Sequence, residues 1–114
     1  MTAQVNALAK PVLKEAKDDV LFVGKLDGDA HGLVTYENSV VGDVVALYVK
    51  TSSGNDFETH FTLTSTTSMP VIFVIPKTIF EKNLVPGANA KLHYSVTRAS
   101  NVSASPVLTV RLEP

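Results

Sequence analysis

The amino-acid sequence predicts an all-β domain in which about seven short strands form two antiparallel sheets that pack face to face. Val, Ile and Thr, whose branched side chains suit a pleated sheet, are abundant along the chain. Apolar residues recur at every second position in several short segments, and this is the period of a half-buried strand. The connections between these segments are short and leave no room for crossover helices, so the sheets are expected to be largely antiparallel.

The first four strands are expected in the N-terminal half of the domain. Residues 20–23 are an apolar run, and residues 33–36 follow a Gly- and Asp-rich turn at residues 25–32. Residues 44–50 are mostly apolar on both faces, which is typical of a strand inside a sheet. After a polar hairpin connection, residues 57–64 alternate between an apolar and a polar face. The buried face of this strand is expected to carry Phe57, Thr59, Phe61 and Leu63.

The C-terminal half is expected to contain three more strands and one short helical turn. Residues 70–76 are an apolar run between two prolines, neither of which can donate to an interior ladder. Residues 77–84 are expected to form the helical turn. Residues 90–97 show the clearest alternation, residues 101–105 are expected to turn, and residues 106–112 form the last strand. Because both sheets have an apolar face that needs a cover, a sandwich is favoured, with a small barrel as the alternative.

The length and composition fit a single globular domain. The chain has 114 residues, of which 45% are hydrophobic and 18% charged, and this is too apolar for intrinsic disorder. Residues 1–16 are mixed in character and are interrupted by Pro11, so we expect them to form a tail or lead-in. Residues 17–114 are expected to form the domain.

Charge and cysteine content exclude several classes of function. The formal net charge is −1 and there is no basic stripe, so we expect neither a nucleic-acid partner nor binding to an anionic membrane. The absence of Cys excludes disulfides, zinc–thiolate sites and thiol catalysis. The longest apolar run is too short for membrane insertion, and the N-terminus lacks the regions of a secretory signal. We therefore expect a protein that is cytoplasmic or exported without an N-terminal signal.

The segment from Asp27 to Gly32 partly matches a calcium-binding loop. It has carboxylates at the first and third positions and Gly at the sixth. Its fifth position is His31, its twelfth is Asn38 instead of Glu, and no flanking helices are expected, so a plain turn is favoured. We expect no metal, and the best candidate ligands are Asp27, Asp29 and Glu37.

Histidines and tyrosines are the other side chains with binding chemistry. His60 and His93 are expected at outward positions of their strands, where they share a face if those strands are neighbours, but no third metal ligand is evident. Tyr94 falls in the apolar phase of its strand, so we expect a buried ring and a hydrogen-bonded hydroxyl near a sheet corner. Tyr36 ends a strand beside polar residues and is the most exposed of the tyrosines. Tyr48 lies on a strand of which either face is a candidate for burial.

The residues do not support an enzyme. The chain has no Gly-x-Ser-x-Gly elbow, no Gly-rich phosphate loop, and no paired carboxylates at strand ends beside an aromatic platform. We therefore expect a module without catalytic activity and without a cofactor.

Four segments carry a resemblance to a known family. Residues 41–47 read Val-Gly-Asp-Val-Val-Ala-Leu, and residues 73–76 read Phe-Val-Ile-Pro. Residues 92–98 read Leu-His-Tyr-Ser-Val-Thr-Arg, and residues 105–110 read Ser-Pro-Val-Leu-Thr-Val. In this order they resemble the immunoglobulin-like repeat domains found in tandem in large bacterial surface and secreted proteins.

The resemblance implies an immunoglobulin-like antiparallel β-sandwich and a role in adhesion or as a structural spacer. The expected partner is a protein, and edge strands make a second copy of the chain a candidate. The alternative is a module that binds a carbohydrate or a receptor through loops at one end, at residues 25–32, 51–56 and 98–105. The candidate ligand-binding residues are Asp27, Asp29, His31, Tyr36, Asn55, Asp56 and Asn101.

Overall fold

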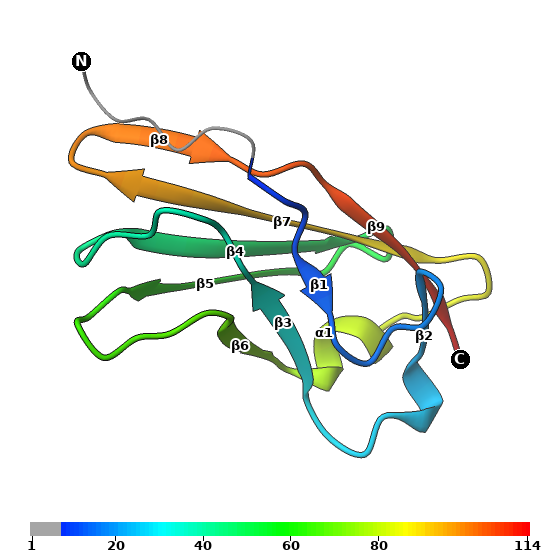
Figure 1. The fold of residues 1–114 in the computed structure, drawn as a ribbon. Coiled ribbons are helices and arrows are strands. Elements are labelled where there is room, and N and C mark those ends of the chain that lie inside the picture. Colours follow the sequence, from blue (N-terminus) through cyan, green and yellow to red (C-terminus); the bar gives the residue numbers. More distant parts are fainter. Residues whose placement is uncertain (1–7) are drawn as a thin grey trace.

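The computed structural model describes residues 8–114, which form two β-sheets packed face to face (Figure 1). The three-stranded sheet has the order β1 (Val12–Leu13), β3 (Ala30–Val34) and β6 (Val71–Ile75). The six-stranded sheet has the order β2 (Val20–Phe22), β9 (Leu108–Glu113), β7 (Asn89–Arg98), β4 (Val44–Thr51) and β5 (Asp56–Thr62), and β8 (Asn101–Ala104) also pairs with β7. The predicted all-β sandwich is confirmed, although the described residues form more strands than the sequence indicated.

Two short helices connect the strands. The helix α1 (Lys77–Glu81) confirms the helical turn predicted near residues 77–84, and Phe80 anchors it in the core. A 3-10 helix, η1 (Val23–Lys25), follows β2. Neither helix of residues 8–114 has the length and apolar character needed to cross a membrane.

The strand pairs are antiparallel except for β2 and β9, which run parallel. The chain leaves the three-stranded sheet after β1 and turns at Asp18 and Asp19, which have φ values of 53° and 60°. Asp tolerates this left-handed conformation better than most residues. The N-terminal strands therefore pair with both sheets, β1 with β3 and β2 with β9.

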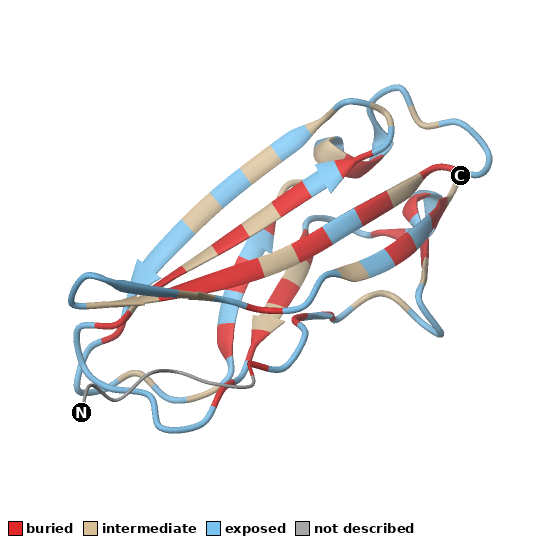
Figure 2. Cartoon of the chain, turned by 90° about the horizontal axis from the view of Figure 1, so that it is seen from above, coloured by how far each residue is buried: buried red, intermediate tan, exposed pale blue. Residues whose placement is uncertain are grey.

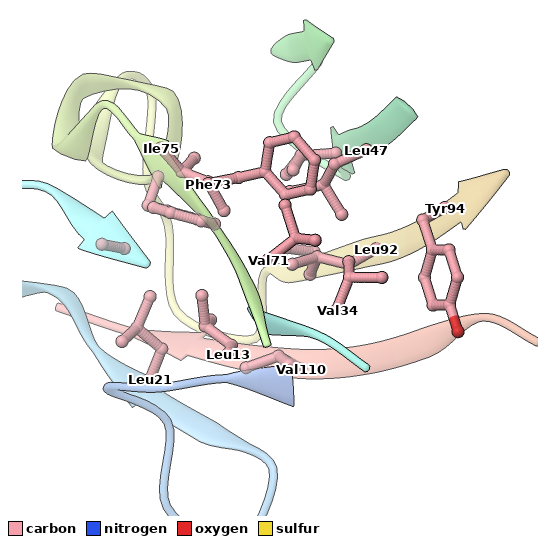
Figure 3. Close-up of a cluster of buried hydrophobic side chains, with 14 of the residues drawn as sticks. Leu13, Leu21, Val34, Leu47, Val71, Phe73, Ile75, Leu92, Tyr94 and Val110 are labelled. Atoms are coloured by element: carbon pink, nitrogen blue, oxygen red, sulfur yellow. The ribbon is translucent and has the colours of Figure 1, made fainter. Parts of the chain in front are cut away.

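The core lies between the two sheets, and buried and exposed residues alternate along the long strands (Figure 2). Side chains from both sheets meet there, with Phe73 of β6 close to Leu47 of β4 (Figure 3). The alternation predicted for residues 57–64 holds for Leu63, which is buried, but Phe61 is 42% exposed. Phe61 is less covered than expected because β5 is an edge strand with a neighbour on one side only.

Part of the segment expected to be a lead-in, residues 1–16, belongs to the sandwich. Leu8 and Leu13 are buried in the core, and β1 pairs with β3. A strand of two residues is too short to show a period in the sequence, which explains why it was not predicted. Residues 1–7 lie outside the described residues.

Two other strand segments lie where turns were predicted. β3 already begins at Ala30, inside the predicted turn at residues 25–32. Gly32 lies where the two sheets approach each other closely, because a Cβ atom there would lie 2.8 Å from Cδ2 of Leu47 on the opposite sheet. β8 has only four residues, too few for its alternation to distinguish a strand from a turn, and backbone pairing with β7 across a two-residue turn forms it.

Tyr94 is buried as predicted, but the predicted hydrogen bond of its hydroxyl is wrong. Within the described part of the chain this hydroxyl has no hydrogen-bond partner, and burial raises its pKa. The nearest tyrosine, Tyr36, has its ring centroid 6.5 Å away and donates its own hydroxyl to Asp43.

Candidate functional site

Tyr48 and His93 form an aromatic pair on the outer face of the six-stranded sheet. β4 and β7 bury alternate residues, so these two side chains, which lie opposite each other in the register, point away from the core. Their rings are stacked, with centroids 4.9 Å apart and an angle of 17° between the ring planes. They line a hollow of about 630 Å³, which we call the aromatic hollow.

The rim of the aromatic hollow is charged. Lys50 lies opposite Asp56 of β5 on one side and Lys91 of β7 on the other, while Glu58 lies opposite Tyr48. These four charged side chains are exposed, and none forms an ion pair with another side chain of residues 8–114. Two lysines directly opposite each other repel. The rim can therefore pair with charges that another molecule brings.

A second hollow, of about 740 Å³, lies beside the loop that precedes β3, and we call it the loop hollow. It brings together three of the predicted ligand-binding residues, Asp27, Asp29 and His31. Nδ1 of His31 lies 2.6 Å from Oε2 of Glu15, and the backbone N–H of His31 donates to Oε1 of Glu15 over 2.8 Å. Burial raises the pKa of Glu15, but the hydrogen bonds from His31 outweigh it, so the pKa lies below its ordinary value.

The carboxylates predicted as the best metal ligands do not form one site. Asp27 and Asp29 precede the N-terminal end of β3, whereas Glu37 follows its C-terminal end, so the length of the strand separates them. Oδ1 of Asp29 accepts a hydrogen bond of 3.3 Å from the backbone N–H of Lys77 and so contacts the start of α1. Residues 8–114 contain no group of three Asp, Glu, His or Cys residues placed to hold a metal ion.

Tyr36, predicted to be the most exposed tyrosine, is buried in a polar network around Asp43. Both carboxylate oxygens of Asp43 accept hydrogen bonds of 2.8 Å from Arg98, and Oδ2 also accepts one of 2.8 Å from the Tyr36 hydroxyl. The Arg98 guanidinium and the other donors outweigh burial and lower the pKa of Asp43 to about 2. Burial and the hydrogen bond to Asp43 raise the pKa of Tyr36. The network holds the loop before β4 and leaves Tyr36 no surface for a ligand.

The other predicted ligand-binding residues are scattered. The amide of Asn55 donates to the backbone carbonyls of Ile79 and Lys82, at 3.0 and 2.8 Å, and so holds α1. Asp56 lies on the rim of the aromatic hollow. Asn101 is an exposed residue of β8 at the end of the sandwich opposite to Asn55, because β4 and β7 run antiparallel. Loops 51–56 and 98–105 therefore do not share one end.

No protein-family model, curated protein or solved structure matches the chain.

The aromatic hollow was not predicted as a site, although parts of its signal are in the sequence. The alternation of apolar and polar residues predicted that His93 faces solvent. It did not decide whether Tyr48 lies on the buried or the exposed face of its strand. The contact between them depends on the register of β4 against β7, which no residue of the sequence reveals. His60 and His93 do lie on one face, but β4 separates their strands, so they are not neighbours.

Proposed function

We propose that the chain is a non-catalytic immunoglobulin-like module that binds a protein partner through the aromatic hollow. The observation that carries the proposal is the stacked pair of Tyr48 and His93 within a charged rim. Protein interfaces have this composition, with aromatic residues at the centre and polar or charged residues around them.

The order of the strands supports the immunoglobulin-like part of the proposal. An immunoglobulin sandwich has strands A, B, E and D in one sheet and G, F and C in the other, with C′ added beside C in the variable type. The order β1-β3-β6 corresponds to A, B and E, and the order β9-β7-β4-β5 corresponds to G, F, C and C′, while no strand of residues 8–114 takes the place of D beside β6. The segments that resemble bacterial immunoglobulin-like repeats lie on or next to β4, β6, β7 and β9.

The stacked rings favour recognition of a protein surface. Tyr48 and His93 have few rotatable bonds, and each ring restricts the other, so ordering them on binding costs little entropy. The rim offers both signs of charge, with Lys50 and Lys91 beside Asp56 and Glu58. A partner with a complementary arrangement of charges would be selected over one without it.

Photo-cross-linking tests the proposed function. A cross-linking amino acid at the exposed position Glu58 is expected to capture a protein from the cell or culture that produces the chain, and Tyr48→Ala with His93→Ala in the same chain should abolish the capture. The matched control carries the cross-linker at Val102, which is 67% exposed on β8. Any protein captured at Val102 is expected to be captured equally with and without the two alanine substitutions.

Three results would contradict the proposal. Equal capture with and without the alanine substitutions would mean that the partner contacts a surface other than the aromatic hollow. Capture at neither Glu58 nor Val102 would favour a structural spacer that binds no partner. Binding on a glycan array that disappears with Tyr48→Ala would replace the protein partner by a carbohydrate.

The loop hollow supports the alternative function, a ligand-binding module. Asp27 and the loop around it form one wall, and the Lys25 ammonium lies 5.1 Å from the centre of the Phe22 ring. Its two best polar groups, His31 and Asp29, are already engaged within the chain. We therefore rank it behind the aromatic hollow.

A further inference from the structure

The strand β6 forms an open edge of the three-stranded sheet. It is the last strand in the order β1-β3-β6, and among residues 8–114 it pairs only with β3. Its five residues, Val71 to Ile75, are all apolar. Ile72 and Val74 point outward and are 60% and 52% exposed. The edge therefore combines unpaired backbone groups with an exposed apolar row.

This row extends across the outer face of the sheet. The register places Ile72 opposite Leu33 of β3, and Leu33 opposite Val12 of β1. Val12 is 54% exposed and Leu33 is half-buried. Soluble monomers usually protect such a strand with charged residues, a proline or a bulge within it. β6 has its prolines, Pro70 and Pro76, only outside its ends.

The edge of the other sheet shows the protection that β6 lacks. β5 carries Asp56, Glu58 and His60 on its exposed face. A second copy of β5 alongside would bring charged side chains into the contact, whereas a second copy of β6 would bring only apolar side chains together. The distribution of charge thus favours one edge for self-pairing.

We propose that two copies of the chain associate through β6, paired antiparallel about a twofold axis at Phe73. In this register Ile72 of each copy lies opposite Val74 of the other, so the strand is complementary to itself. The two three-stranded sheets then form one continuous sheet. The proposal concerns a surface other than the aromatic hollow, so either can fail without the other.

We favour a second copy of the chain over an unrelated extended peptide. The selective feature of β6 is that the strand can pair with itself about a twofold axis. The strand presents no charge and no hydrogen-bonding side chain that would select another sequence. Pairing of five residues covers less area than a standard interface of about 1,600 Å². The association is therefore expected to be reversible and to depend on concentration.

Light scattering after size exclusion, over a range of chain concentrations, tests the proposal. The wild-type mass is expected to rise from that of one chain towards that of two. Ile72→Lys with Val74→Lys places lysine opposite lysine across the axis and should weaken the association by about tenfold or more. Ile72→Glu with Val74→Lys places glutamate opposite lysine at the same two positions and should restore it.

These variants alter side chains that are more than half exposed, so the fold should persist, and the melting temperature of each variant checks this. Val102→Lys is the control, since it adds a lysine at an exposed apolar position on β8 and should leave the association unchanged. A wild-type mass of one chain at all concentrations would overturn the proposal. Equal association of the two-lysine variant and the wild type would also overturn it, and failure of the glutamate–lysine variant to recover would exclude the twofold register.

Discussion

Asp43 is an ionised side chain with only 1% of its surface exposed. Its charge is balanced by Arg98, and the Tyr36 hydroxyl and the backbone N–H of Val40 complete its hydrogen bonds. Such a group stabilises the folded state only while it remains charged and paired. The network joins the start of β4 to the end of β7, so its protonation state affects the stability of the sheet.

We predict that acid weakens the fold through Asp43. The folded-state pKa is about 2, below the ordinary value of 3.8, so this contribution is fully present above about pH 4 and is lost as the pH falls through 2. The shift corresponds to about 2 kcal/mol. Urea unfolding at pH values from 7 to 2 should show this loss in the wild type and a smaller one in Asp43→Asn. Identical pH dependence of the two proteins would contradict the assignment, and Glu58→Gln, at an exposed and unpaired carboxylate, is the control.

Tyr94 allows a second prediction about a single polar atom. Its buried hydroxyl has no partner in the described residues, and such a group costs about 1–3 kcal/mol to desolvate. We expect Tyr94→Phe to leave the free energy of unfolding unchanged or to raise it by about 1 kcal/mol. Tyr36→Phe, which removes the hydrogen bond to Asp43, should lower it by about 1–2 kcal/mol. Urea denaturation of the two variants compares them directly, and a clear loss of stability in Tyr94→Phe would mean that its hydroxyl makes a stabilising contact.

At the scale of the elements, β3 shows how sheet packing fixes a residue. A Cβ atom at Gly32 would lie 2.8 Å from Leu47 and 3.3 Å from Ile75, and both of these side chains are completely buried. Gly32→Ala should therefore lower the free energy of unfolding by about 1–2 kcal/mol through overpacking. Gly28→Ala, where no atom lies within 4 Å, should change it little. Thermal or urea unfolding measures both, and equal stability of the two variants would show that the sheets move apart at no cost.

The strands differ in how well their own residues predict them. Residues 44–50 and 90–97 were predicted because each strand shows its burial in its own side chains. Gly32 carries no side chain, so its place in a strand is indistinguishable from a turn in the sequence. β1 and β8 owe their existence to the strands that they pair with, and local patterns contain no record of a partner.

The candidate site follows the same rule. Alternation within β7 identified His93 as outward, yet its contact with Tyr48 requires the register between two strands. Tyr36 looked exposed beside polar neighbours, but the burial of its ring depends on Asp43 and Arg98, which follow it by 7 and 62 positions. The outward position of His93 was thus predictable from the sequence. The long-range contacts that give His93 and Tyr36 their roles were not.

At the scale of the whole molecule, the two proposed contact surfaces lie on different sheets. The molecule is elongated, with extents of 48 × 24 × 22 Å. The aromatic hollow lies on the outer face of the six-stranded sheet, and β6 is the edge of the three-stranded sheet. Pairing through β6 therefore leaves Tyr48 and His93 accessible.

The open edge of β6 has a consequence for valency. A twofold axis perpendicular to the joined sheet keeps both six-stranded sheets on the same side of it, so two aromatic hollows would point in one direction. A partner displayed in many copies on a surface could then engage both at once. Binding of this kind gains avidity, because the second contact forms at a high effective concentration without any new residue.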